Sequence, residues 1–169
     1  MTDGETQGTM ARRIRQRSRG FTLIELVVTI SIIAILAAVA LPRFIALQTQ
    51  ARIAKTQALY GGLRSAAVLA HAQVIATNTI ASGPVTIQME AQNVTMFNGY
   101  PTADLAGIQT ALQISNVTED VNITPGGAGA GATFTVDVNG GTVPNCRVTY
   151  TSPIVGNGSP TIGVATGGC

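Results

Sequence analysis

The chain has 169 residues, of which 11% are charged and 4% are aromatic, and it contains no tryptophan. This length suits one modest domain with an added membrane anchor. The formal net charge of +2 is uneven, because residues 1–20 hold five arginines against two acids, a net +3, and the rest carries −1. The composition therefore excludes a strongly basic nucleic-acid-binding surface on the later residues.

The amino-terminal region is basic up to Gly20, and an apolar segment begins at Phe21. Positive residues beside an apolar segment stay in the cytoplasm, so this order directs the later residues outward. A secretory signal peptide is cut after its apolar region, beside small residues. Here the expected cut follows Gly20 and precedes the apolar region, which keeps the helix in the mature protein. An uncleaved anchor is the alternative, and translation could start at Met1 or at Met10.

Residues 21–41 are expected to form the membrane-spanning half of a long helix. They are apolar apart from Thr22, Glu25, Thr29 and Ser31. Twenty-one helical residues extend about 31 Å, which is enough to cross a bilayer. A carboxylate exposed to lipid costs at least a few kcal/mol, so Glu25 is by default a functional residue with a partner.

The helical pattern continues through residues 42–78. Steps of three and four between small or apolar residues predict one helix face, which comprises Phe44, Leu47, Ala51, Ala54, Ala58, Gly62, Ala66, Ala70 and Val74. A helix over residues 22–77 would be about 85 Å long, which is more than a bilayer needs. We therefore expect its second, amphipathic half to pack on a head outside the membrane.

Two positions are predicted to interrupt this helix. Pro42 cannot donate a hydrogen bond to the carbonyl of Ala38, and its ring crowds that turn, so a kink is expected at the membrane exit. Local melting at Pro42 is an alternative. Gly61 and Gly62 indicate either a bend or a flat patch for close packing.

The composition changes in residues 79–169, which we interpret as an α+β head. The expected elements before residue 133 are a turn at 82–84, strands at 85–89 and 94–97, a turn at 98–101, a helix at 102–112 and a loop at 115–132. Thr102 is the expected N-cap of the short helix, with Asp104 in its first turn.

The clearest strand signal is the strict alternation of residues 133–138. Phe134, Val136 and Val138 share one face of this strand. A hairpin turn is expected at residues 139–141. A second strand follows, in which Cys146, Val148 and Tyr150 share one face, and a third is expected at residues 161–164. The predicted fold is therefore α+β, with the long helix packed on an antiparallel sheet.

Cys146 and Cys169 are the two cysteines of the chain. An even number of cysteines in an exported domain indicates a disulfide, although two free thiols are the alternative. A metal site is poorly supported, because His71 is the one histidine and lies far away in the sequence. Its expected role is that of a solvated or packed helix residue.

The segment Gly20-Phe-Thr-Leu-Ile-Glu-Leu follows a basic region and opens an apolar helix. This combination resembles the processing site and amino-terminal helix of type IV pilins and their relatives. The resemblance implies cleavage by a prepilin peptidase between Gly20 and Phe21, N-methylation of the new Phe21 amine, and a role of Glu25 in filament assembly.

A weaker likeness to the mannose-sensitive haemagglutinin (MSHA) class of type IV pilins appears in the head. It is carried by Asn98-Gly-Tyr-Pro-Thr, Gly107-Ile, Cys146-Arg-Val-Thr-Tyr and Gly168-Cys. The resemblance to type IV pilins implies a helical homopolymer on the cell surface that serves adhesion. Before assembly, the resemblance implies a subunit anchored in the inner membrane with its head in the periplasm. The implied partners are the prepilin peptidase and methyltransferase, the assembly platform and its ATPase.

The same leader leaves two other functions open. The chain could be a pseudopilin of type II secretion. It could also be a minor pilin or a membrane-anchored binding module with a pilin leader, such as a tip adhesin or a DNA-uptake component. Nucleic-acid binding is not expected, because Arg147 is the one basic residue after Arg64. The sequence also lacks Ser/His/Asp spacing and a phosphate loop, so neither an enzyme nor a cofactor is expected. Asp137 and Asn139 do not complete a calcium loop.

Overall fold

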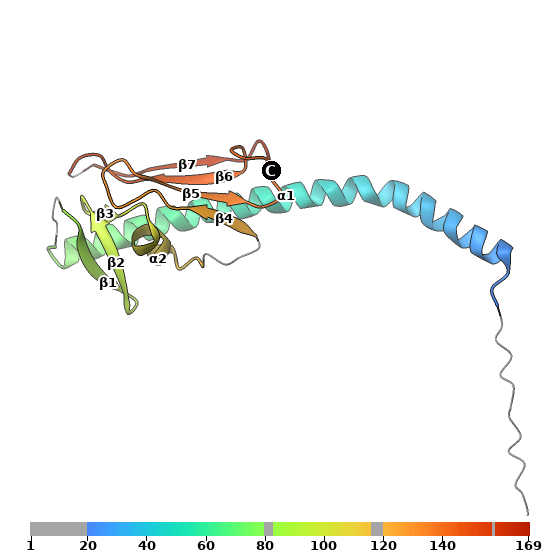
Figure 1. Cartoon of the computed structure of the whole chain (residues 1–169), viewed down its shortest axis with the longest axis horizontal. Helices are drawn as coiled ribbons and strands as arrows, with labels where there is room; N and C mark the ends of the chain where they lie inside the picture. Colours follow the sequence, from blue (N-terminus) through green and yellow to red (C-terminus); the bar gives the residue numbers. More distant parts are fainter. Residues whose placement is uncertain (1–19, 80–82, 116–119, 157) are drawn as a thin grey trace, which may run out of the picture. The chain divides into compact units, whose positions relative to one another are not determined.

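A computed structural model describes residues 20–79, 83–115, 120–156 and 158–169 (Figure 1). The chain forms two compact units, Met1–Pro42 and Arg43–Cys169, and each is described by itself. Helix α1 (Leu23–Ala76) supplies residues to both units. The predicted leader lies outside the described residues except for Gly20.

In the first unit, α1 exposes all of its side chains. By length and composition, α1 is the one helix in the described part of the chain that could cross a membrane. The expected helix over residues 22–77 is confirmed to within one residue at each end. Pro42 lies inside α1, at the boundary of the two units, and the kink stays a prediction.

In the second unit, one face of α1 is buried, and it differs in part from the predicted face. The buried residues are Thr56, Leu63, Ala66, Ala67, Ala70 and Val74. The prediction is therefore confirmed at Ala66, Ala70 and Val74. It is wrong for the earlier positions of the predicted face that are exposed, which are Phe44, Leu47, Ala51, Ala54 and Ala58. In that stretch the head covers a different face, on which Thr56 is buried and Ile53, Leu59 and Tyr60 pack partly buried against the core.

The first sheet of the head is antiparallel and has the order β1 (Val85–Met89), β2 (Gln92–Phe97) and β3 (Tyr100–Pro101). Its buried side chains form a small core with the end of α1, comprising Ala70, Val74, Ile87, Val94 and Met96. The turn predicted over residues 98–101 is confirmed as the two-residue turn Asn98–Gly99. Both of its residues have positive φ, 53° and 81°, as a tight two-residue hairpin requires.

The turn predicted over residues 98–101 is wrong in its second half, because residues 100–101 form β3. The hairpin at Asn98 and Gly99 reverses the chain at once, so Tyr100 pairs with Phe97 across the turn. Proline is tolerated there because β3 is an edge strand, whose outward N–H position needs no partner in the sheet.

A short helical segment follows, formed by η1 (Leu105–Gln109) and α2 (Thr110–Leu112). Its N-cap is Asp104, whose carboxylate accepts a hydrogen bond from the backbone N–H of Gly107 at 2.8 Å. The predicted N-cap at Thr102 is therefore wrong. The hydroxyl of Thr102 is buried and donates to the same carboxylate at 2.7 Å, so it holds the cap in place.

The second sheet is antiparallel, with the order β4 (Val121–Thr124), β5 (Thr133–Val138), β6 (Arg147–Thr151) and β7 (Thr161–Ala165). The strands expected at 133–138, 146–150 and 161–164 are confirmed to within one residue at each end. The loop predicted over 115–132 is wrong at β4, which pairs with β5 along its whole length. Polar neighbours mask the short apolar alternation of β4 in the sequence.

The connection from β5 to β6 is longer than the predicted tight hairpin. The N–H of Val138 still donates to the carbonyl of Cys146 at 3.0 Å, but residues 139–146 lie outside both strands. The ladder then continues with Asp137 opposite Arg147.

The main core lies between the second sheet and α1. The inward faces predicted for β5 and β6 are confirmed, since Phe134, Val136, Val148 and Tyr150 are fully buried. They pack with Leu63 of α1. Figure 1 shows the four-stranded sheet lying along the second half of α1, with β1–β3 near the carboxyl end of the helix. The fold is α+β as predicted, although it contains two antiparallel sheets rather than one.

Candidate functional site

The amino-terminal motif lies at the exposed start of α1. Phe21 precedes the helix and its side chain is 84% exposed. The backbone N–H of Glu25 donates to the hydroxyl of Thr22 at 3.3 Å, which satisfies one of the free N–H groups of the first turn. A carboxylate in the first turn also suits the positive end of the helix dipole, so Glu25 stabilises the start of α1.

The other polar side chains of this segment are satisfied by their own helix. Thr29 donates to the carbonyl of Glu25 at 3.0 Å and to that of Leu26 at 2.8 Å. Ser31 donates to the carbonyl of Val27 at 2.8 Å. These hydroxyl groups therefore need no water and are compatible with an apolar environment. Glu25 is the one charged side chain between residues 20 and 42.

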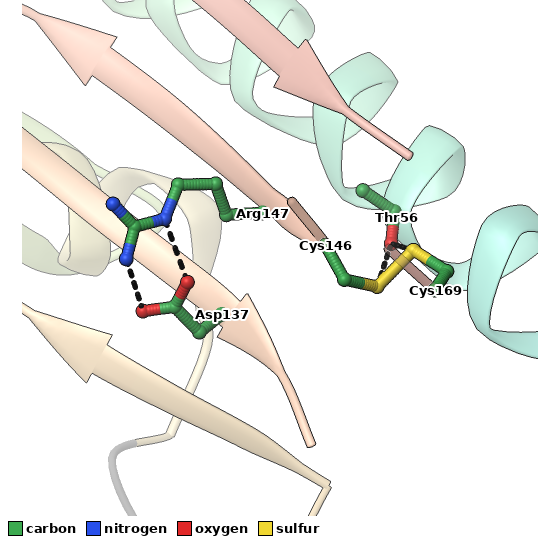
Figure 2. A network of polar contacts seen from close by, with 5 residues as sticks. All are labelled: Thr56, Asp137, Cys146, Arg147 and Cys169. Atoms are coloured by element: carbon green, nitrogen blue, oxygen red, sulfur yellow. Dashed lines mark hydrogen bonds and ion pairs between the residues drawn. A yellow bond between two sulfur atoms is a disulfide. The ribbon is translucent and has the colours of Figure 1, made fainter. Parts of the chain in front are cut away.

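A second cluster secures the end of the chain to α1. Cys146 and Cys169 form a disulfide with an S–S distance of 2.02 Å, which confirms the predicted bridge. Figure 2 shows the hydroxyl of Thr56 beside both sulfur atoms, at 3.6 Å and 3.5 Å. Arg52, one turn earlier, donates from Nε to the carbonyl of Cys169 at 2.5 Å. The disulfide thus lies directly against α1.

Asp137 in the second sheet and Asp120 beside it are each paired with a cation. Asp137 receives two hydrogen bonds from Arg147, at 2.7 Å and 3.0 Å, across β5 and β6 (Figure 2). Asp120 pairs with Lys55 of α1 at 3.1 Å. In the described ranges, no group of three histidine, cysteine or acidic side chains could hold a metal ion. Both carboxylates therefore act as structural contacts in the head.

His71 has two partners that its sequence position did not indicate. Its Nδ1 lies 2.7 Å from the carbonyl oxygen of Gly99, and its ring stacks on Tyr100 with centroids 4.1 Å apart. These contacts confirm His71 as a packed helix residue. Only the return of the chain through the Asn98–Gly99 hairpin brings the partners to α1.

The structure brings together one pair of predicted site residues, Cys146 and Cys169, and adds Thr56 and Arg52 to them. No pattern in the sequence indicates Thr56, because a threonine on a helix is usually solvated. Gly20, Phe21 and Glu25 are neighbours in sequence at the start of α1, and their predicted roles concern other molecules.

Comparison with known proteins identifies the amino-terminal region. A family model described as the prokaryotic N-terminal methylation motif matches residues 15–41. The type IV narrow pilus major component PilA5 of Thermus thermophilus is 49% identical over 57 residues, which are 34% of this chain and 49% of that protein. The type IV major pilin protein PilA of Myxococcus xanthus is 49% identical over 57 residues, covering 31% of this chain and 26% of that protein.

The chain thus spans about half of the first relative and about a quarter of the second. No solved structure matches the chain. The amino-terminal region of this chain thus carries the prokaryotic N-terminal methylation motif and is similar to that of two type IV pilins, and its long amino-terminal helix on an α+β head agrees with the fold that this resemblance predicts.

Proposed function

We propose that the chain is a structural subunit of a bacterial type IV pilus. One observation carries this proposal: residues 23–42 of α1 expose a continuous apolar surface with Glu25 as its one charge. Such a surface is stable in a bilayer, where the helix satisfies its own backbone groups. Outside the bilayer it needs other apolar helices around it, which a filament core of identical subunits supplies.

Assembly would begin with processing between Gly20 and Phe21 by a prepilin peptidase and methylation of the new amine. A methylated amine remains cationic. The Glu25 carboxylate of an incoming subunit would then pair with the Phe21 amine of its neighbour. Each charge is costly in an apolar core when alone, and pairing removes most of that cost. The pair would also fix the axial register between subunits.

The head would reach the periplasm before assembly and the cell surface afterwards. The disulfide between Cys146 and Cys169 suits both oxidising locations. The assembly platform and its ATPase would move the subunit from the inner membrane into the filament. The short motifs of the head support an MSHA-like pilus used for attachment. Since type IV pilins are structural proteins, the prediction that the chain is not an enzyme is confirmed.

A pseudopilin of type II secretion is the second candidate, because it would share the leader, α1 and Glu25. A minor pilin or tip adhesin shares them as well. The disulfide favours a pilin, where such a bridge commonly secures the end of the head.

The deciding experiment is intact-mass and amino-terminal peptide analysis of filaments sheared from producing cells. A pilin is expected as an abundant species that begins at N-methylated Phe21 and is two hydrogens lighter than its reduced form. Recovery of the processed chain from the cell envelope alone would contradict a major pilin and favour a pseudopilin or a minor subunit.

A further inference from the structure

Charge pairing within the described head leaves two acids, Asp104 and Glu90, without a cation. Asp137 and Asp120 have the ion pairs given above, and Asp104 caps η1. Glu90 differs from the half-buried Asp104, because it is exposed and caps no helix, and its described partner is the neutral side-chain amide of Gln113. Its negative charge is therefore not neutralised by any described residue of the same chain.

The backbone presents Glu90 at the tip of a tight hairpin. Met89 pairs with Gln92, so Glu90 and Ala91 alone form the turn between β1 and β2. Both have positive φ, 47° and 64°, and both are exposed. A tight turn of this kind favours Asn-Gly, and a residue with a Cβ there stores strain.

The chain uses Asn-Gly for its other two-residue hairpin, at residues 98–99. The strained choice at Glu90 therefore places a carboxylate at an outer tip at some cost in stability. Backbone strain is kept in the turn at Glu90 and avoided in the turn at residues 98–99. This difference points to a function of the Glu90 carboxylate in contact with another molecule.

A groove of about 410 Å³ on another part of the head has the complementary charge. Arg64 of α1 is exposed at its edge and makes no ion pair with any residue in the described ranges. Tyr60, Tyr100 and Ile162 line the same groove. A guanidinium beside aromatic and apolar walls binds a carboxylate well, because part of the water around the ion pair is excluded.

We infer that the Glu90 turn of one subunit docks in the Arg64 groove of a second copy of this chain. This inference rests on the proposed function, since it concerns contacts between pilin heads. The turn and the groove are different surfaces of one molecule, so each contact leaves a free turn at one end and a free groove at the other. When such a heterologous contact is repeated from subunit to subunit without closing a ring, it builds an open helical polymer.

Charge reversal in cells that produce the full chain tests the contact. Arg64→Glu and Glu90→Arg should each lower the yield of sheared filaments about tenfold or more, because like charges then face each other. The double variant Arg64→Glu/Glu90→Arg restores opposite charges and should regain most of the yield. Co-expression of the two single variants should also restore filaments, because their turns and grooves then match in alternation.

Arg43 provides a matched control, since it is exposed and has no described ion pair either. Arg43→Glu combined with Glu90→Arg should not regain filaments. Oxidised Cys146–Cys169 and normal membrane levels verify that each variant folds. Wild-type yield from Arg64→Glu, or no recovery in the double variant, would overturn the docking and leave the proposed function intact. A wild-type chain that forms no filaments would overturn both.

Discussion

The buried hydroxyl of Tyr150 donates a hydrogen bond to the carbonyl oxygen of Pro101 at 2.7 Å. Tyr150 belongs to β6 of the second sheet and Pro101 to β3 of the first. The bond therefore joins the two sheets of the head at a fully buried position. It also satisfies a phenol group that would be costly to bury alone.

Tyr150→Phe should reduce the free energy of unfolding by about 1–3 kcal/mol, because the Pro101 carbonyl then loses its buried donor. Denaturant unfolding of the detergent-solubilised full chain, followed by circular dichroism, measures the change. Tyr60→Phe is the matched control, since the Tyr60 hydroxyl makes no hydrogen bond to the described residues and its loss should change stability little. Equal stability of both variants would contradict the role of the inter-sheet bond.

Alkaline pH should weaken the head through the same tyrosine. Burial, with a smaller contribution from Tyr100, raises the pKa of Tyr150 well above its ordinary value of 10.0. Above that ordinary value the unfolded state loses the proton while the folded state keeps it, so stability falls as pH rises. Unfolding curves from pH 8 to 11.5 should show a loss above about pH 10 that is smaller in Tyr150→Phe.

The disulfide should contribute about 3 kcal/mol, because it closes a loop of two dozen residues in the unfolded chain. Replacing Cys146 and Cys169 together by serine removes this constraint and the contact with Thr56. Urea unfolding with and without reductant measures the effect. Reductant should destabilise the wild type and leave the serine variant unchanged. An unchanged wild type would show that the bridge does not stabilise the head.

Gly107 should tolerate no side chain, because a Cβ there would lie 2.2 Å from the backbone oxygen of Thr102 and 2.2 Å from its hydroxyl. Gly107→Ala should therefore cost about 2 kcal/mol or more by displacing the cap at Asp104. Gly61→Ala is the control, since nothing lies within 4 Å of its added Cβ and alanine favours the helix. Thermal unfolding should show a lower midpoint for the first variant and an unchanged or higher one for the second.

The sequence predicted those parts of the fold that local pattern determines. The apolar run of α1 and the alternation of residues 133–138 give a helix and a strand without tertiary information. The strand β4 was not predicted because its local sequence pattern is weak. Its pairing with β5, which the sequence does not display, stabilises it as a strand. The strand at Tyr100 was missed because the turn has only two residues, 98 and 99. The chain therefore pairs again from Tyr100 onward, where the sequence suggested that the turn continues.

The residues of the candidate site also differ in whether the sequence alone could predict them. Gly20, Phe21 and Glu25 form a local motif, which the sequence displays in full. Thr56 and Arg52 contact the disulfide across 90 or more residues of sequence, and no periodicity indicates such a contact. Long-range polar contacts on a helix face require the fold before they can be recognised.

Glu25→Ala should leave membrane insertion and leader cleavage intact and lower the yield of sheared filaments at least about tenfold. An incoming subunit would lose its partner for the Phe21 amine of its neighbour, and an uncompensated charge in an apolar core costs several kcal/mol. Ser31→Ala is the matched control, because its hydroxyl donates only to Val27 of its own helix and should be dispensable. Immunoblots of membranes and sheared fractions measure both steps. Filaments at the wild-type level from Glu25→Ala would contradict the pairing, whereas accumulation of processed subunit in the membrane would support it.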